Sequence, residues 1–250
     1  MQKAACKAMA LRPCLLAAAV FSATLADAEA FLRFTGAPLT RSVRNEADAA
    51  IDRACAWLAA KQSPDGSWSS GIKTTSVCLL ALAGSGEELP EKERETVRKG
   101  IDWLKGTVEA DTDDVSPEDA AWRDMAFAVL APDALRKPFA EIPCPDDCTA
   151  AAACAIRERA AILGIGDAAA SPKSVPRPGE DAECAWWFAH AANRNPGGEI
   201  TFAPGTEPVA WRESLANAWT VSQQIDERGR GFWPGSAEDT AFAILLLKEL

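Results

Sequence analysis

Residues 53–68 constrain the fold of this chain more than any other segment. They read Arg-Ala-Cys-Ala-Trp-Leu-Ala-Ala-Lys-Gln-Ser-Pro-Asp-Gly-Ser-Trp, and the apolar residues recur at the spacing of one helix face. Pro-Asp-Gly at residues 64–66 then favours a turn that ends the helix. We expect the Gln62 amide to bond carbonyl groups at the helix end while Trp68 packs back across the turn. The segment therefore predicts a helix, a turn and an indole anchor in one unit.

The order of residue types in this unit resembles the QW motif of the squalene/hopene cyclase and prenyltransferase repeat family. That motif runs from a basic and a small residue through an aromatic and an aliphatic residue to Gln, Gly and Trp. The matching residues are Arg53, Ala54, Trp57, Leu58, Gln62, Gly66 and Trp68. The resemblance implies an all-α fold, the α/α toroid, in which helical hairpins form an inner and an outer ring.

The pattern recurs at intervals of roughly 45 to 60 residues, which predicts about four helical hairpins and a partial or small barrel. Outer helices are expected at residues 50–62, from 99, at 149–163 and at 211–224; inner helices are expected at 75–83, 124–131, 181–193 and 239–247. Asp124 and Asp239 open near-identical sequences and correspond in this alignment. The repeat-motif residues are Trp57, Gln62, Gly66, Trp68, Trp103, Gln224, Gly231 and Trp233.

Residues 1–28 have the features of a secretory signal peptide. Lys3, Lys7 and Arg12 precede an apolar run over residues 15–25, and Ala-Asp-Ala follows as a cleavage site. We expect a periplasmic or secreted protein with an extended segment over residues 29–45 and one repeat domain over residues 46–250. No stretch reaches the roughly 20 apolar residues of a membrane helix, so no transmembrane segment is expected.

The net charge of −10 disfavours nucleic acid as a partner, because an acidic protein repels the phosphate backbone. No basic cluster along a helix face counters this repulsion. The partner classes left open are an isoprenoid or other apolar ligand, and another protein.

The cysteines leave two interpretations open. Cys55 and Cys78 lie on predicted helices, where a buried thiol and a disulfide are both reasonable. Cys144 and Cys148 suggest a loop disulfide. The prenyltransferases of the family use an Asp/Cys/His zinc site, but His190, the single histidine, lacks a suitably spaced partner and is expected to be structural. We expect no metal and no cofactor. Six cysteines follow the predicted signal peptide: Cys55, Cys78, Cys144, Cys148, Cys154 and Cys184.

Two acidic segments are candidates for a catalytic acid. The cyclases of the family carry Asp-x-Asp-Asp-Thr-Ala at the start of an inner helix, and the middle Asp protonates an alkene. Asp113 matches those letters, but the apolar helix begins several residues later. Glu238 and Asp239 have the helix-start context with different letters, Ser-Ala-Glu-Asp-Thr-Ala. The alternative for Asp113 is a loop or capping role, and for Glu238 and Asp239 it is capping of the helix N-terminus.

Polycyclisation also needs aromatic side chains around a cavity, because ring faces stabilise cations. Trp186, Trp187 and Phe188 are the candidates for such a pocket wall, and packing between helices is the alternative. Neither acidic segment supplies both letters and context, so we expect a non-catalytic binding or structural scaffold. The alternative function is a class II terpenoid cyclase with an Asp or Glu general acid.

Overall fold

A computed structural model describes residues 39–83, 91–109, 115–135, 142, 149–165, 181–193 and 211–250. These residues form eight α-helices, one short 3₁₀-helix and one antiparallel pair of strands, which confirms the all-α class. The helices are α2 (Arg41–Lys61), α3 (Ile72–Ala83), α4 (Glu91–Glu109), α5 (Pro117–Leu130), α6 (Ala150–Leu163), α7 (Ala182–Asn193), α8 (Trp211–Ser222) and α9 (Ala237–Glu249). The 3₁₀-helix η1 is Pro132–Ala134, and the strands are β1 (Gln224–Ile225) and β2 (Gly231–Phe232).

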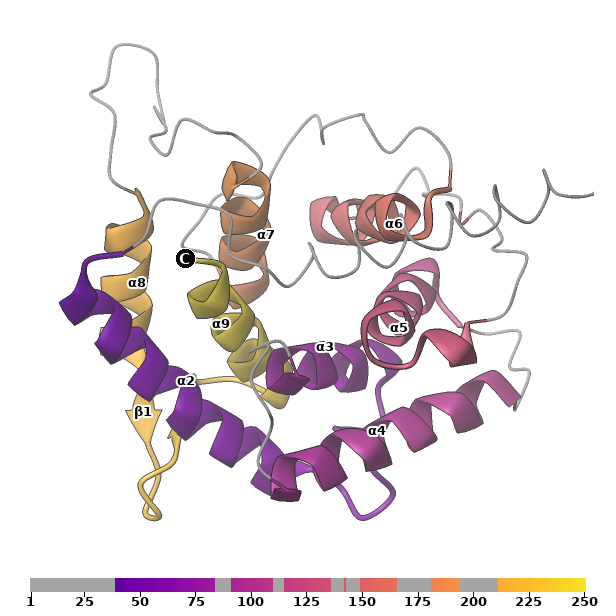
Figure 1. Ribbon diagram of the computed structural model, residues 1–250, viewed down its shortest axis with the longest axis horizontal. Coiled ribbons are helices and arrows are strands. Elements are labelled where there is room, and N and C mark those ends of the chain that lie inside the picture. Colours follow the sequence, from indigo (N-terminus) through magenta and orange to yellow (C-terminus); the bar gives the residue numbers. More distant parts are fainter. Residues whose placement is uncertain are drawn as a thin grey trace, which may run out of the picture.

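Helices α3 and α9 lie at the centre of the molecule, with α5 and α7 beside them and α2, α4 and α8 outside (Figure 1). Helix α3 packs against α5 and α9, and α9 also packs against α7. Helix α2 packs against α9, α4 against α3, and α6 against α5. The central position explains the sequence of α3 and α9, which are buried over most of their length and carry almost only apolar or small residues there.

Helix α5 begins at Pro117 rather than at the predicted Asp124. The start signals are local: the Ser116 side chain accepts a hydrogen bond from the Asp119 backbone, and proline occupies the first turn. The alignment of Asp124 with Asp239 is therefore wrong, because Ser236 caps α9 as Ser116 caps α5. Asp124 instead lies inside α5 and pairs with Arg159 of α6 at 2.8 Å.

Other boundaries differ from expectation as well, among them the start of α4, which lies at Glu91 instead of residue 99. Helix α2 begins at Arg41, so the last residues of the segment predicted to be extended are helical. No proline or glycine interrupts the chain between Arg41 and Lys61, and the helix continues until the turn residues that follow. Helix α8 ends at Ser222, and Gln224 lies in strand β1 instead of a helix.

Several predictions concern residues outside the described ranges. They include the signal peptide over residues 1–28, most of the extended segment over residues 29–45, Asp113, Cys144 and Cys148. Within the described ranges, no helix is both long enough and apolar enough to cross a membrane.

Candidate functional site

Trp68 and Trp233 make the same pair of hydrogen bonds in two parts of the chain. The Trp68 indole donates to the Leu58 carbonyl oxygen at 2.9 Å, and its backbone N–H donates to Thr75 Oγ1 at 3.0 Å. The Trp233 indole donates to the carbonyl oxygen of Trp219 at 2.9 Å, and its backbone N–H donates to Thr240 Oγ1 at 3.2 Å. Each indole, rather than the expected glutamine amide, thus bonds a carbonyl in the last turn of the preceding helix.

The glutamines of the two units connect helices that are distant in sequence. Gln62 Nε2 donates to the Gly66 carbonyl at 2.9 Å and to the Thr96 carbonyl of α4 at 2.8 Å. In the last unit Gln223 Nε2 donates to the Ala50 carbonyl of α2 at 2.8 Å. Gln223, not the predicted Gln224, is therefore the counterpart of Gln62, since each directly follows the last residue of its helix.

The first turns of α3, α5, α7 and α9 meet at one charged site, which we call the Lys73 cluster. Its members are the second residues of these four helices: Lys73, Glu118, Glu183 and Glu238. The Lys73 ammonium lies 2.9 Å from Glu118 Oε1, 2.8 Å from Glu183 Oε2 and 3.3 Å from Glu238 Oε1. One cation thus links three inner helices to a fourth.

Hydrogen bonds hold the Lys73 cluster in place. Thr74 Oγ1 donates to Glu238 Oε2 at 2.5 Å, and the Lys73 backbone N–H donates to Asp119 Oδ1 at 3.0 Å. The Lys73 ammonium also lies 5.6 Å from the centre of the Phe242 ring, within the range of a cation–π interaction. The cluster therefore contacts the buried ring of Phe242 through Lys73.

Lys73 and Glu183 of the cluster both have raised pKa values, for different reasons. Burial opposes the charge on Lys73, but attraction to Glu183 and hydrogen bonds to Glu183 and Glu118 outweigh burial and raise the pKa of Lys73. Burial also raises the pKa of Glu183, and the neighbouring Lys73 offsets this only in part. Lys73 is hence a fixed cation, and Glu183 takes up a proton more readily than an ordinary glutamate.

The structure assigns different roles to the predicted acidic residues. Glu238 belongs to the Lys73 cluster. The sequence comparison did not predict this cluster, because it aligned Asp124 with Asp239, whereas Glu118 and Glu238 occupy corresponding positions as the second residues of their helices. Asp239 completes a capping box, in which its carboxylate accepts from the Ser236 backbone and hydroxyl at 2.7 Å each. Asp239 is thus engaged in capping α9.

Trp186 and Trp187 lie inside the protein among other rings. The Trp122 ring centre is 5.5 Å from that of Trp186 and 5.7 Å from that of Trp187, and the Phe242 ring is 5.4 Å from Trp122. Both predicted pocket-wall indoles are almost fully buried, while Phe188 is only partly buried against the same core. Packing between α5, α7 and α9 accounts for these rings.

The described cysteines and the histidine show no metal-binding arrangement. Cys55, Cys78 and Cys154 are buried free thiols, so Cys55 and Cys78 follow the first of the two interpretations, the buried thiol. The half-buried Cys184 thiol lies 3.4 Å from Asp181 Oδ2. In the described ranges no three His, Cys, Asp or Glu side chains are grouped to hold a metal ion. His190 is buried between Glu158 and Glu249, partners that lie on α6 and α9 and are invisible to local sequence spacing.

No protein-family model, curated protein or solved structure matches the chain. The resemblance to the cyclase and prenyltransferase repeats therefore rests on the motif residues themselves.

Proposed function

We propose that this protein is an exported α/α-toroid scaffold of QW-like hairpins that binds a partner or an apolar ligand without transforming it. The observation that carries the proposal is the ion pair between Lys73 and Glu238 at the start of α9. Export is inferred from the basic, apolar and small-residue pattern of residues 1–28.

The surroundings of Glu238 suit a structural carboxylate better than a proton donor. Protonation of an alkene needs a carboxyl group that holds a proton and releases it to carbon. Glu238 instead accepts a hydrogen bond from Thr74 and pairs with the Lys73 ammonium, so both of its carboxylate oxygens are held by side chains of α3. A carboxyl group held in this way is suited to joining helices.

Corresponding contacts support the toroid. Gln62 of the first hairpin bonds Thr96 of α4, and Gln223 of the last bonds Ala50 of α2. Thr96 and Ala50 occupy corresponding places, each three residues before the basic residue of the motif. A contact from the last unit back to the first helix is what closed stacking of hairpins requires.

Ring stacking supports the same arrangement. The Trp57 ring of α2 stacks on Phe232 of β2, with ring centres 5.4 Å apart. Arg53 of α2 also donates through Nε to Gln223 Oε1 at 3.0 Å. The first and last described units are thus joined by polar and aromatic contacts together.

A class II terpenoid cyclase is the second candidate, and one observation favours it. The Lys73 ammonium, which pairs with the three carboxylates of the cluster, lies over the Phe242 ring, and that ring contacts Trp122 and Trp186. Acidic groups near aromatic rings are the combination that cation-forming cyclisation requires. The raised pKa of Glu183 makes this residue a group to examine as an acid.

The deciding experiment is incubation of the purified protein with squalene and with a shorter polyprenoid, followed by mass spectrometry of the extracted lipids. We expect unchanged substrate from the wild type and from Glu183→Gln and Glu238→Gln, because neither carboxyl is arranged as a proton donor to carbon. A cyclic product that disappears in either variant, but persists in the exposed-site control Glu95→Gln, would establish the cyclase instead.

A further inference from the structure

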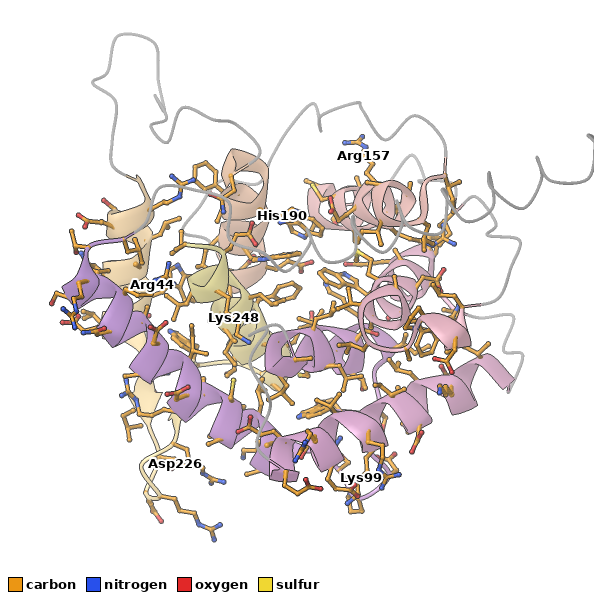
Figure 2. The ribbon with its side chains drawn as sticks, viewed as in Figure 1. Arg44, Lys99, Arg157, His190, Asp226 and Lys248 are labelled. Atoms are coloured by element: carbon orange, nitrogen blue, oxygen red, sulfur yellow. The ribbon has the colours of Figure 1, made fainter. Side chains whose placement is uncertain are left out.

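His190 of α7, the only histidine of the chain, lies in the interior between α6 and α9 (Figure 2). Its Nδ1 is 3.3 Å from Glu249 Oε1 of α9, and its Nε2 is 3.3 Å from Glu158 Oε1 of α6. All three side chains are more than nine-tenths buried. A single imidazole ring thus contacts carboxylates of two different helices.

The geometry favours one protonation state of the ring. A neutral imidazole carries one N–H, so its second nitrogen presents a lone pair. In this site that lone pair would face a carboxylate oxygen at 3.3 Å on either side of the ring. The imidazolium, in which both nitrogens carry hydrogen, converts both contacts to attraction.

Other charged and polar side chains lie near the ring. Glu158 of α6 and Glu249 of α9 are the carboxylates that face it, and Arg212 of α8 is the nearby cation. Arg212 Nε donates to Asn193 Oδ1 at 3.1 Å, and Asn193 Nδ2 donates to Glu249 Oε1 at 3.1 Å. With His190 protonated, the ring therefore belongs to a buried network of oppositely charged and polar groups.

Helix α6 packs against α7, and we call the boundary between these two helices the seam. On one side, Arg159 of α6 pairs with Asp124 of α5 at 2.8 Å. On the other side, the adjacent Glu158 reaches His190 of α7. The hairpin of α5 and α6 thus connects to α7 and α9 through the imidazole ring and the neighbouring indoles.

We infer that His190 is a buried imidazolium that latches α6 to α7 and α9, and that loss of its proton releases α6 from this seam. The inference is independent of the proposed function, since a scaffold and an enzyme would both contain the latch. When the ring becomes neutral, one of its two contacts changes from attraction to repulsion between a nitrogen lone pair and a carboxylate oxygen.

The direction of the pH effect follows from the pKa of His190. Burial would lower this pKa, but the charges of Glu158 and Glu249 and hydrogen bonds to them outweigh burial and raise it from 6.5 to about 9. Because the folded protein holds the proton more tightly than the unfolded chain, the contribution to stability is complete below pH 6.5 and is lost as the pH rises through about 9.

The test uses the single histidine as its own probe. Protein labelled with ¹⁵N at histidine alone gives one ring signal set, whose chemical shifts distinguish imidazolium from imidazole. We expect imidazolium at pH 7 and a titration midpoint near 9. Hydrogen-exchange protection of α6 amides, corrected for intrinsic rates, should fall roughly tenfold across that titration while protection of α3 stays constant.

Two variants provide the matched comparison. Glu158→Gln should move the midpoint down, because it removes one facing charge; Arg157→Gln, one residue away on the exposed face of α6, should leave the midpoint unchanged (Figure 2). A neutral ring at pH 7 in the wild type would overturn the inference, and this result needs no variant to fold. Constant α6 protection across the titration would equally exclude the latch.

Discussion

At the scale of single residues, Gly66 shows how a motif position is dictated by backbone geometry. Its φ is +96°, in the left-handed region that side chains strain. A Cβ atom added there would also overlap the Lys99 carbonyl of α4. The turn after α2 thus approaches the next outer helix so closely that only glycine fits.

We predict that Gly66→Ala destabilises the protein by about 2–4 kcal/mol, from left-handed strain plus the clash with a backbone oxygen. Gly106→Ala is the matched control, because Gly106 is exposed in the last turn of α4 and a Cβ there meets no neighbour. This second change should stabilise the protein by up to about 0.5 kcal/mol through helix propensity, which counts less in a last turn than in a helix interior. Urea unfolding of both variants measures the difference, and similar effects at the two sites would refute the close approach.

At the scale of helices, Gln223 connects the end of α8 to α2. Its amide donates to the Ala50 carbonyl at 2.8 Å and accepts from Arg53 Nε at 3.0 Å. Gly231 of β2 leaves the space that the Gln223 side chain occupies, since a Cβ at Gly231 would overlap the amide. Gln224, the neighbouring residue, is exposed in β1.

Gln223→Ala should therefore destabilise the protein by about 1–2 kcal/mol, through loss of two hydrogen bonds between α8 and α2. Gln224→Ala removes an identical side chain from an exposed position and should change stability by less than about 0.5 kcal/mol. Thermal or urea unfolding distinguishes the two. A larger loss from Gln224→Ala would restore Gln224 as the motif residue.

At the scale of the whole molecule, the Lys73 cluster ties the starts of all four inner helices together. The second residue is a Glu in α5, α7 and α9 and a Lys in α3, and the three Glu side chains surround this Lys. Helix N-termini favour negative charge, so the carboxylates are stabilised by the helix ends as well as by Lys73. Without the lysine, three mostly buried carboxyl groups would lie together at the starts of these helices.

We predict that Lys73→Met destabilises the protein by about 2–4 kcal/mol at pH 7, because it leaves carboxylates without their cation. The pKa of Glu183 already lies above its ordinary value of 4.5, so the folded state binds a proton more tightly than the unfolded chain. Stability of the variant should then rise as the pH falls from neutral toward 4.5.

Urea unfolding at pH 7 and pH 5 tests this recovery. The control is Lys99→Met, which removes a half-exposed lysine that lies 3.6 Å from Glu95 on the surface of α4. Its effect should stay below about 0.5 kcal/mol at both pH values. If Lys73→Met lowered the free energy of unfolding no more than Lys99→Met does, the Lys73 cluster would contribute no more to stability than an exposed ion pair.

The sequence by itself determined the features that depend on neighbouring residues. Apolar spacing placed a helix near each of its eight predicted positions, and Pro-Asp-Gly after Gln62 marked the end of α2. Ser236 and Asp239, three residues apart at the start of an apolar run, carry the local signal of a capping box, and α9 has this box. These signals are readable because helix periodicity and capping act within a few residues.

Only the tertiary structure decided which residues of distant helices meet. Lys73 and Glu183 are 110 residues apart in sequence, and Gln223 and Ala50 are 173 apart, so no local spacing relates them. His190 likewise lacked a partner in sequence and gained two carboxylates when α6, α7 and α9 came together. Charge pairing across a core depends on how helices pack, and packing is a property of the folded chain as a whole.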